Sequence, residues 1–364
     1  MADIPGVSIT GLTAVLPSGT LDHGEMIRRF GDRAADPIAK MSGILQRRVV
    51  SPSQQASDLA LTAAERLLQH TKVDRSEISL LVFASITPDY RSPSTACVLH
   101  GKLGLSETCA AFDINQACSA YPYALGVAHS MIRSGLCRLA LVLNGEALTR
   151  LVHPLDRSLA MLHSDGAAAT LVAACAPGYG FEAFRLGTDG KAAKSIIALA
   201  GGLRLPSSAD TRVERVDASG CVRTEEHLAM DGPAVFHFSV YKVPEVIRAT
   251  LHDLAITMDD IDNVLLHQAN KTMMDLIYRA LKVPAAKRFY CLEQMGNCGG
   301  PSVAIALAEA WRQGIIRPGS RTLICSFGAG LAWGVTVIRW PEDAQPVPDL
   351  DPVVSDEDML SAAL

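Results

Sequence analysis

Apolar residues follow two alternating patterns along this chain. Continuous apolar runs such as 79–87 and 137–146 are typical of strands that are buried on both faces of a sheet. Between such runs, segments 57–73 and 119–135 carry apolar residues at helical spacing, and Ser57 is the expected N-cap of the first. The alternation of buried strands with helices predicts α/β units.

The second half of the chain repeats the element order of the first half. One expected helix runs from Cys118 to Gly135, a distance of 17 positions. A second runs from Asn297 to Gly314, which is also 17 positions. A helix, an acidic turn and a buried strand precede each of them, and another strand follows. This match of four elements predicts an internal duplication.

We therefore expect two similar α/β halves, residues 1–175 and 176–340, packed against each other. Segment 190–225 is rich in glycine, serine and charge and is expected to be an insertion loop. Residues 341–364 contain several prolines and no strong periodicity, which predicts a disordered acidic tail. The alternative for the end of this tail is a short helix, capped by Ser355, that docks on a partner.

Composition and charge argue against several classes of protein. The 364 residues are 49% hydrophobic, so the chain can bury a large core and is neither disordered nor collagen-like. The net charge is −5, which argues against a nucleic-acid partner. The tail has seven acidic residues and no Lys or Arg, so the body carries about +2. No apolar run reaches about 18 residues, and we see no secretory signal, so we expect a cytoplasmic protein without a membrane span.

The nine cysteines do not indicate a disulfide framework. Their number is odd and no pair has C-x-x-C spacing, so a four-cysteine zinc site is not expected either. The simplest expectation for each is a small, buried, apolar side chain in a reducing compartment. A cysteine with a chemical role needs an argument of its own.

Cys118 has such an argument, because it lies between a strand candidate and an apolar helix. A thiol at a helix N-terminus faces unpaired N–H groups and the positive end of the helix dipole, which favour the nucleophilic thiolate. His267 ends a buried strand, at the sheet edge where α/β proteins bind ligands. Asn297 takes the position in the second half that Cys118 has in the first. The structural alternatives are a packing cysteine, a core histidine and a helix N-cap.

If the halves are related by a pseudo-twofold axis, the three side chains meet at one central site. A thiol there can accept an acyl group as a thioester. Imidazole and carboxamide can donate hydrogen bonds to a second carbonyl and stabilise the enolate that forms as CO2 leaves. The glycine-rich turn 326–330 offers N–H groups for an oxyanion hole, together with the amide of Cys118. Cys298, beside Asn297, is a competing nucleophile.

These residues lie in sequence blocks that resemble those of a known family. The blocks DINQACSAY, LLHQAN, GNCGGPSVAIAL and FGAGLAWG, together with LDRSLAMLHSDGAAA, are similar to those of the 3-oxoacyl-[acyl-carrier-protein] synthase III family of the thiolase superfamily. The resemblance runs from about Gly6 to Trp340, with order and spacing kept. The joint occurrence of the cysteine with H-Q-A-N and G-N is highly specific.

The resemblance implies a five-layered αβαβα thiolase fold and a homodimer. It implies that Cys118 is the acyl-accepting nucleophile and that His267 and Asn297 serve decarboxylation and condensation. It also implies an oxyanion hole formed by the backbone amides of Cys118 and Ala329, and we count Gly328 among the substrate-binding residues. No cofactor or metal is expected, since the substrates are thioesters of coenzyme A or of an acyl carrier protein.

Several positions depart from the family pattern. Stretch 36–44, DPIAKMSGI, lacks the Trp and Arg that clasp coenzyme A in better-known members. Pro233 replaces an Asn that binds the pantetheine arm, and Thr272 replaces an Arg. Ser92 replaces the aromatic residue that caps the partner's acyl pocket, whereas Arg157 matches a basic residue that contacts the nucleotide. These changes predict an acyl donor that is longer or larger than a short acyl-coenzyme A.

A carrier-protein donor fits the charges of the chain. Acyl carrier proteins are acidic, so docking needs a basic surface. Four basic residues soon after His267 offer one: Arg279, Lys282, Lys287 and Arg288. The alternative is that they form a solvated helix face.

The leading interpretation is a condensing enzyme of fatty-acid, polyketide or specialised metabolism. A malonyl or 3-oxoacyl thioester would attack the acyl group on Cys118. One alternative is an acyltransferase in which His267 is the general base for an alcohol or amine acceptor. Another is a non-catalytic partner subunit that binds acyl chains. Asn297 favours condensation, because simple acyl transfer has less use for a second carbonyl-binding donor.

Overall fold

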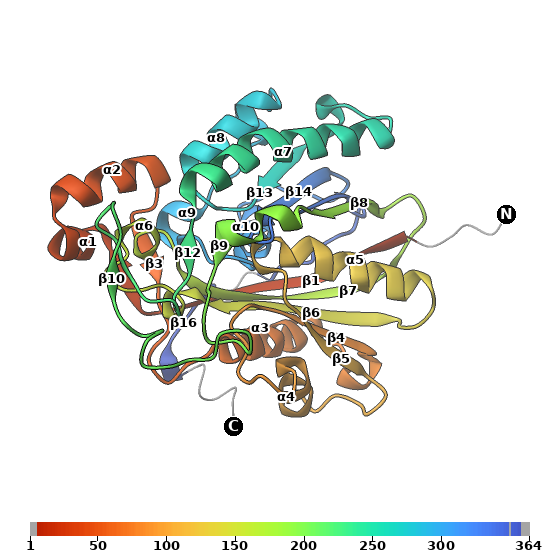
Figure 1. The fold of residues 1–364 in the computed structure, drawn as a ribbon. Coiled ribbons are helices and arrows are strands. Elements are labelled where there is room, and N and C mark those ends of the chain that lie inside the picture. The colour runs from red at the N-terminus through yellow and green to blue at the C-terminus, as the bar shows by residue number, and fades with distance from the viewer. Residues whose placement is uncertain (1–5, 349–350, 358–364) are drawn as a thin grey trace.

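The computed structural model describes residues 6–348 and 351–357, which form two main sheets with helices between and outside them (Figure 1). The strands of the first sheet are, in spatial order, β16 (Val353–Val354), β1 (Gly6–Pro17), β7 (Asp165–Cys175), β6 (Leu139–Ala147), β4 (Leu80–Ala84) and β5 (Ala110–Ile114). Those of the second are β13 (Asn263–Leu266), β14 (Arg321–Gly328), β15 (Ala332–Arg339) and β8 (Gly180–Thr188).

The longer helices occupy three layers. The inner layer contacts strands of both sheets and consists of α5 (Ala120–Arg133) and α10 (Ser302–Arg312). The outer face of the first sheet is covered by α3 (Ala56–Thr71) and α4 (Thr95–Lys102). The outer face of the second is covered by α7 (Gly232–Asp253) and α8 (Lys271–Ala280). The predicted αβαβα fold is confirmed.

Buried apolar side chains fill the spaces between these layers. One cluster surrounds α5 and α10 and joins them to both sheets, for example through Leu125, Val142 and Ile324. A second lies beneath α3 and α4, and a third beneath α7 and α8. The strands are apolar on both faces because each sheet has helices on both sides.

Both halves contain the same chain path through the inner layer. In the first, the chain passes from β4 through α4 and β5 to α5, then to β6, which is parallel to β4, and to antiparallel β7. In the second, it passes from β13 through α8 and α9 to α10, then to parallel β14 and antiparallel β15. The division into two halves at the β7–β8 turn stays a prediction, and this shared order of inner helix, parallel strand and antiparallel strand is compatible with it.

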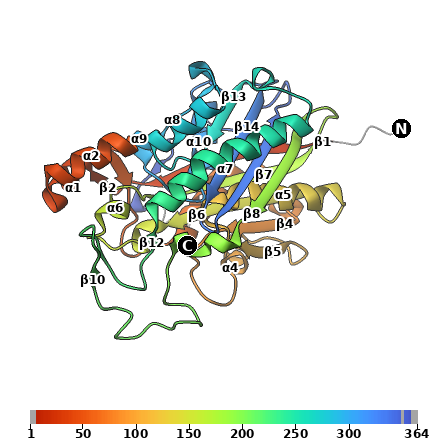
Figure 2. The same ribbon diagram turned by 45° about the horizontal axis from the view of Figure 1, so that its top comes forward.

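The remaining helices and the two-stranded ribbons lie outside these layers. The helices are α1 (His23–Phe30), α2 (Asp32–Ser42), α6 (Arg157–Ala160) and α9 (Leu292–Met295). The two-stranded ribbons pair β2 (Thr20–Asp22) with β3 (Gln46–Arg48), β9 (Ile196–Ile197) with β12 (Ala229–Met230), and β10 (Arg215–Val216) with β11 (Val222–Arg223). The chain between β9 and β12, residues 198–228, forms a long excursion (Figure 2) that largely coincides with the predicted insertion loop 190–225.

The start of α3 differs from the prediction. The N-cap is Gln55 rather than Ser57, and the backbone N–H of Gln55 donates to the Asp58 carboxylate at 2.8 Å. Ser57 lies within the first turn and is buried. The reciprocal bonds of the capping box therefore fix this helix two residues earlier than the serine alone suggests.

The prediction of a disordered tail is wrong for its described residues, 341–348 and 351–357. The backbone N–H of Leu12 donates to Pro346 at 2.6 Å, and β16 pairs in parallel with the end of β1. Val354 is buried, and Gln54 donates to the Asp356 carboxylate at 3.1 Å. The tail is ordered because it hydrogen-bonds to the edge of β1, an interaction that the composition of the tail does not predict. Most of the alternative helix after Ser355 lies outside the described residues.

The cysteines also differ in part from expectation. Cys109, Cys137, Cys221, Cys298 and Cys325 are buried, whereas Cys97 on α4 is exposed. Within the described residues, no helix is both long enough and apolar enough to cross a membrane.

Candidate active site

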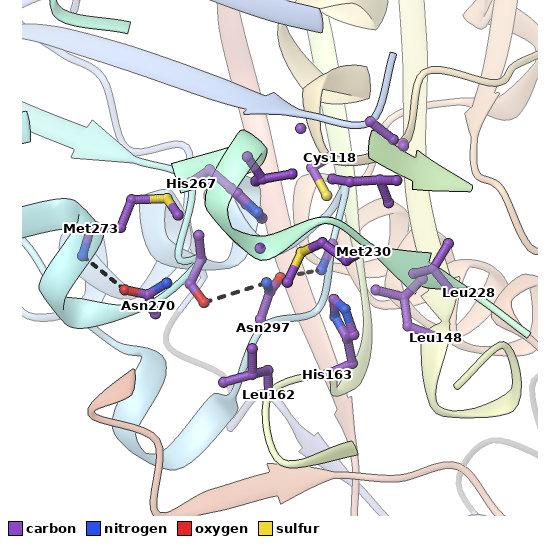
Figure 3. Close-up of a pocket in the computed structure, with 18 of the residues that line it drawn as sticks. Cys118, Leu148, Leu162, His163, Leu228, Met230, His267, Asn270, Met273 and Asn297 are labelled. Atoms are coloured by element: carbon purple, nitrogen blue, oxygen red, sulfur yellow. Dashed lines mark hydrogen bonds between the residues drawn. The ribbon is translucent and has the colours of Figure 1, made fainter. Parts of the chain in front are cut away.

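A cavity of about 460 Å³ collects the predicted reactive side chains from both halves of the chain (Figure 3). Cys118, His267 and Asn297 all line it, together with Gly328 and Ala329. The rest of its wall is largely apolar, and the larger apolar residues are Ile38, Met41, Ile86, Leu148, Leu162, Ile196, Leu228, Met230, Val235, Phe236, Met273 and Phe327. The predicted convergence on one site is therefore present in the fold.

Cys118 lies in a short 3₁₀ turn, Ala117–Ser119, between β5 and α5. Ala117 has a φ of 44°, a left-handed conformation that is strained for a residue with a Cβ. The turn brings Cys118 against Gly328 at the end of β14. A Cβ on Gly328 would lie 2.6 Å from the Cys118 Cβ and 3.0 Å from its sulfur. Position 328 therefore needs glycine to let the second half approach the thiol.

The resting thiol of Cys118 is protonated, contrary to the prediction from the helix dipole. Burial raises its pKa to about 12, and the nearby Glu146 carboxyl adds to this rise. The backbone N–H groups of Cys118 and Ala329 act in the opposite direction, because they donate toward the sulfur. Desolvation outweighs these donors, so a base must take the proton before the sulfur attacks.

His267 follows β13, and its backbone N–H donates to Cys325 on the neighbouring strand at 2.8 Å. Its ring lies edge-on to Phe327, with centroids 5.7 Å apart. Burial and, to a smaller extent, the nearby His163 together lower the pKa of His267 to about 3. The imidazole is therefore neutral and has a free lone pair, but it is a weak base at rest.

Asn297 is not the N-cap of α10, which begins five residues later at Ser302. Its Oδ1 accepts from the Gly299 backbone N–H at 2.9 Å and from the Ser302 hydroxyl at 3.4 Å. Its Nδ2 donates to the carbonyl of Ala269 at 3.5 Å, a long bond. Because the oxygen is held in place, the amide nitrogen remains as a donor for a ligand in the cavity.

Two titratable residues of the cavity wall were not singled out in the sequence. Glu146 is fully buried and accepts from the Ile86 backbone N–H and from the hydroxyls of Ser85 and Thr87. Burial nevertheless raises its pKa to about 8. His163 is also buried, beside Asn297. Each lies at the end of an apolar stretch of the sequence. A single titratable residue in that position is the sequence feature that could have marked both as candidate site residues.

Other predicted contacts lie outside this cavity. Ser92 is exposed and is not part of the wall in its own chain. Arg157 begins α6, and its guanidinium donates to the Ser219 carbonyl in the excursion between β9 and β12. In the structure Arg157 therefore holds that excursion, and its contact with a nucleotide stays a prediction.

The four basic residues after His267 do not form one outward-facing surface. Lys287 donates to the carbonyls of Met258 and Asp259, both at 3.0 Å. Arg288 donates twice to the Val283 carbonyl and lies over the Tyr278 ring. Arg279 and Lys282 are exposed at the C-terminal end of α8. The patch is therefore smaller than the sequence suggests.

Comparisons with known proteins agree with this geometry. The family model described as 3-oxoacyl-[acyl-carrier-protein] synthase III matches residues 112–190, and the model of the C-terminal part of that family matches residues 251–340. A beta-ketoacyl-[acyl-carrier-protein] synthase III of Caldanaerobacter subterraneus subsp. tengcongensis is 34% identical over 340 residues, which cover 93% of this chain and 99% of that protein. The chain belongs to the 3-oxoacyl-[acyl-carrier-protein] synthase III family.

Solved structures give the same assignment. A 3-oxoacyl-(acyl-carrier-protein) synthase III superposes with a TM-score of 0.90 at 34% identity, covering 92% of this chain and 100% of that one. The priming β-ketosynthase of the R1128 polyketide pathway gives 0.82 at 28% identity, covering 94% and 98%. This member of the synthase III family is thus a condensing enzyme of the acyltransferase class, as the sequence predicts. In the described part of the chain, no cluster of His, Cys, Asp or Glu is arranged to hold a metal.

Proposed function

We propose that this enzyme loads an acyl group onto Cys118 and condenses it with a malonyl or 3-oxoacyl thioester. The observation that carries the proposal is the convergence of thiol, imidazole and carboxamide on one apolar cavity, with two backbone amides directed at the sulfur. A non-catalytic subunit would have no use for this arrangement. Relatives from Caldanaerobacter subterraneus and Fusobacterium nucleatum are beta-ketoacyl-[acyl-carrier-protein] synthases III, which supports the same reaction.

Loading begins when the acyl thioester binds and the Cys118 proton passes to neutral His267 as the sulfur attacks. The thiolate attacks the acyl thioester, and the amides of Cys118 and Ala329 hold the oxyanion of the tetrahedral intermediate. The carbon–sulfur bond to the donor then breaks, and the donor thiolate leaves with the proton from His267. Cys118 now carries the acyl group.

Condensation uses the donors from the second half. His267 and Asn297 hydrogen-bond the thioester carbonyl of the malonyl substrate, so the enolate that forms as CO2 leaves is stabilised. Its carbon attacks the acyl group on Cys118. The new carbon–carbon bond forms, the acyl–sulfur bond breaks, and the Cys118 thiolate is released for protonation.

The cavity favours an acyl donor larger than acetyl. Its volume of about 460 Å³ and its apolar wall offer space for a medium chain. The stretch 36–44 and Pro233 lack the coenzyme-A-binding residues of better-known members. A carrier protein that docks near Arg279 and Lys282 is therefore our preferred donor.

We further propose a cytoplasmic homodimer. Strand β5 is an edge of the first sheet, and Ala110 on it is exposed, so a second copy can extend the sheet there. Ser92, exposed in its own chain, would then contact the partner's acyl pocket. Free cysteines are compatible with a reducing compartment.

The test is intact-protein mass spectrometry after incubation with acyl thioesters of increasing chain length, followed by a malonyl thioester. We expect a medium-chain adduct that is absent in Cys118→Ala and present in Cys298→Ser, the control for the competing thiol. Release of CO2 with a new carbon–carbon bond supports condensation. Acetyl-only loading would contradict the larger donor, and transfer to an alcohol or amine without CO2 would contradict condensation.

A further inference from the structure

The polar side chains of the cavity wall are nearly all engaged within the protein. Asn270 accepts from the Met273 backbone N–H at 2.8 Å, and the Thr272 hydroxyl donates to the Met41 carbonyl at 2.8 Å. Among the described residues of this wall, the buried side-chain atoms without a hydrogen-bond partner are Nδ1 of His267 and Nδ1 of His163. His267 has a role in the proposed reaction, whereas His163 has none.

His163 occupies a defined position in the cavity. It follows α6, pairs through its backbone with Asn297, and is 8% exposed. Figure 3 shows its ring on the Leu148 and Leu228 side of Asn297, away from the Asn270 side. A buried polar atom is costly unless a hydrogen bond compensates it, so a partner supplied by a ligand is the simplest explanation for its retention.

The chemistry of the site limits what that ligand group can be. Burial lowers the pKa of His163 to about 4, so the ring is neutral and carries one N–H and one lone pair. No Lys or Arg is found among the described residues of the wall, so no cation there could pair directly with a carboxylate on the chain; the charge of Arg47 reaches His163 from outside the wall. The ring already has a hydrogen bond to the Asn297 backbone, so an unsubstituted alkyl chain would leave only Nδ1 unpaired. A hydroxyl group matches it, because a hydroxyl can both donate and accept.

We propose that His163 is a specificity-determining residue that hydrogen-bonds a hydroxyl group on the acyl chain carried by Cys118. The inference rests on the proposed function, since it requires acyl loading at that cysteine. It narrows the donor from any larger acyl thioester to a hydroxyacyl thioester. The ring selects the chain and takes no part in bond making.

The experiment is a competition between octanoyl and hydroxyoctanoyl N-acetylcysteamine thioesters, with the hydroxyl at each chain position in turn. Intact-protein mass spectrometry reads the ratio of the two adducts on Cys118. We expect the wild type to prefer one hydroxylated isomer by about tenfold, the effect of one hydrogen bond. His163→Phe should remove the preference, and His163→Asn should retain part of it.

A matched control is His129→Phe. His129 on α5 is half-buried and likewise has an unpartnered Nδ1, but its ring packs edge-on to Phe181 and tilted against Phe184, outside the cavity. This variant should keep the wild-type ratio. If His163→Phe does not fold, His163→Asn and the wild-type ratio still decide the question.

The inference is overturned if the wild type shows no preference for any hydroxylated isomer, if His163→Phe keeps that preference, or if a chain ending in a carboxylate is preferred. Those outcomes leave loading at Cys118 intact. Failure of every thioester to acylate Cys118 would instead overturn the proposed function, and the two failures are thereby distinguishable.

Discussion

The two halves of the molecule share one strand–helix–strand path but present different chemistry to the cavity. In the first half, α5 begins two residues after Cys118, so a strained turn presents a thiol and an amide together. In the second, α10 begins five residues after Asn297, and the intervening loop holds the carboxamide through Gly299. A duplicated scaffold thus acquires a nucleophile or a carbonyl-binding donor according to the turn before its inner helix.

The largest expected effect concerns the nucleophile of the first half. With a pKa of about 12, resting Cys118 should react with iodoacetamide at pH 7 about 10³-fold more slowly than an ordinary cysteine, because so little thiolate is present. Because the pKa is raised, the rate should keep increasing with pH up to that value. Mass-resolved labelling from pH 6 to 11 measures this, with exposed Cys97 as an internal reference. A plateau near pH 8 would show that the resting thiol is not held protonated.

A substitution in the second half should affect condensation but not acyl loading. Asn297→Ala removes a donor to the malonyl carbonyl, so condensation should fall by about 10²- to 10³-fold while acyl loading persists. Single-turnover mass spectrometry follows both steps in one sample. Asn270→Ala, which removes a helix cap at the cavity rim, is the control for a lost amide near the site. Equal loss of loading and condensation in Asn297→Ala would contradict the division of labour.

A substitution at the contact between the two halves should have a smaller effect on the reaction rate. Gly328→Ala places a Cβ against Cys118, and the resulting displacement should slow acylation by about 10²-fold. Acylation rates by stopped-flow or mass spectrometry measure the effect. Gly101→Ala, where the added Cβ meets nothing within 4 Å, should acylate normally. If Gly328→Ala were acylated at the wild-type rate, the contact between position 328 and Cys118 would have to tolerate an added Cβ.

The smallest effect is expected at the surface of the second half. Reversing Arg279 and Lys282 to Glu should raise KM about tenfold for a carrier-protein donor but not for the same acyl group on coenzyme A. Lys72→Glu, at the end of α3 on the opposite outer layer, is the control and should leave KM for both donors unchanged. If KM rises for neither donor, the docking surface lies elsewhere.

The sequence predicts the strands, the inner helices and the convergence of Cys118, His267 and Asn297, because local periodicity and the family motifs encode them. It does not predict features that depend on contacts distant in the chain. The tail is ordered by the edge of β1, and Lys287 is turned inward by the carbonyls of residues 258 and 259. Likewise, the protonated state of Cys118 depends on how deeply the second half buries it.

The most direct test of the central claim follows wild-type enzyme through one turnover. The enzyme is first loaded with a medium-chain acyl thioester, and a ¹³C-labelled malonyl thioester is then added. The account predicts that the adduct, mapped to Cys118, disappears at the rate at which labelled CO2 appears, one molecule for each acyl group, with a 3-oxoacyl product. An adduct on another residue, or loss of the adduct without CO2, would contradict it.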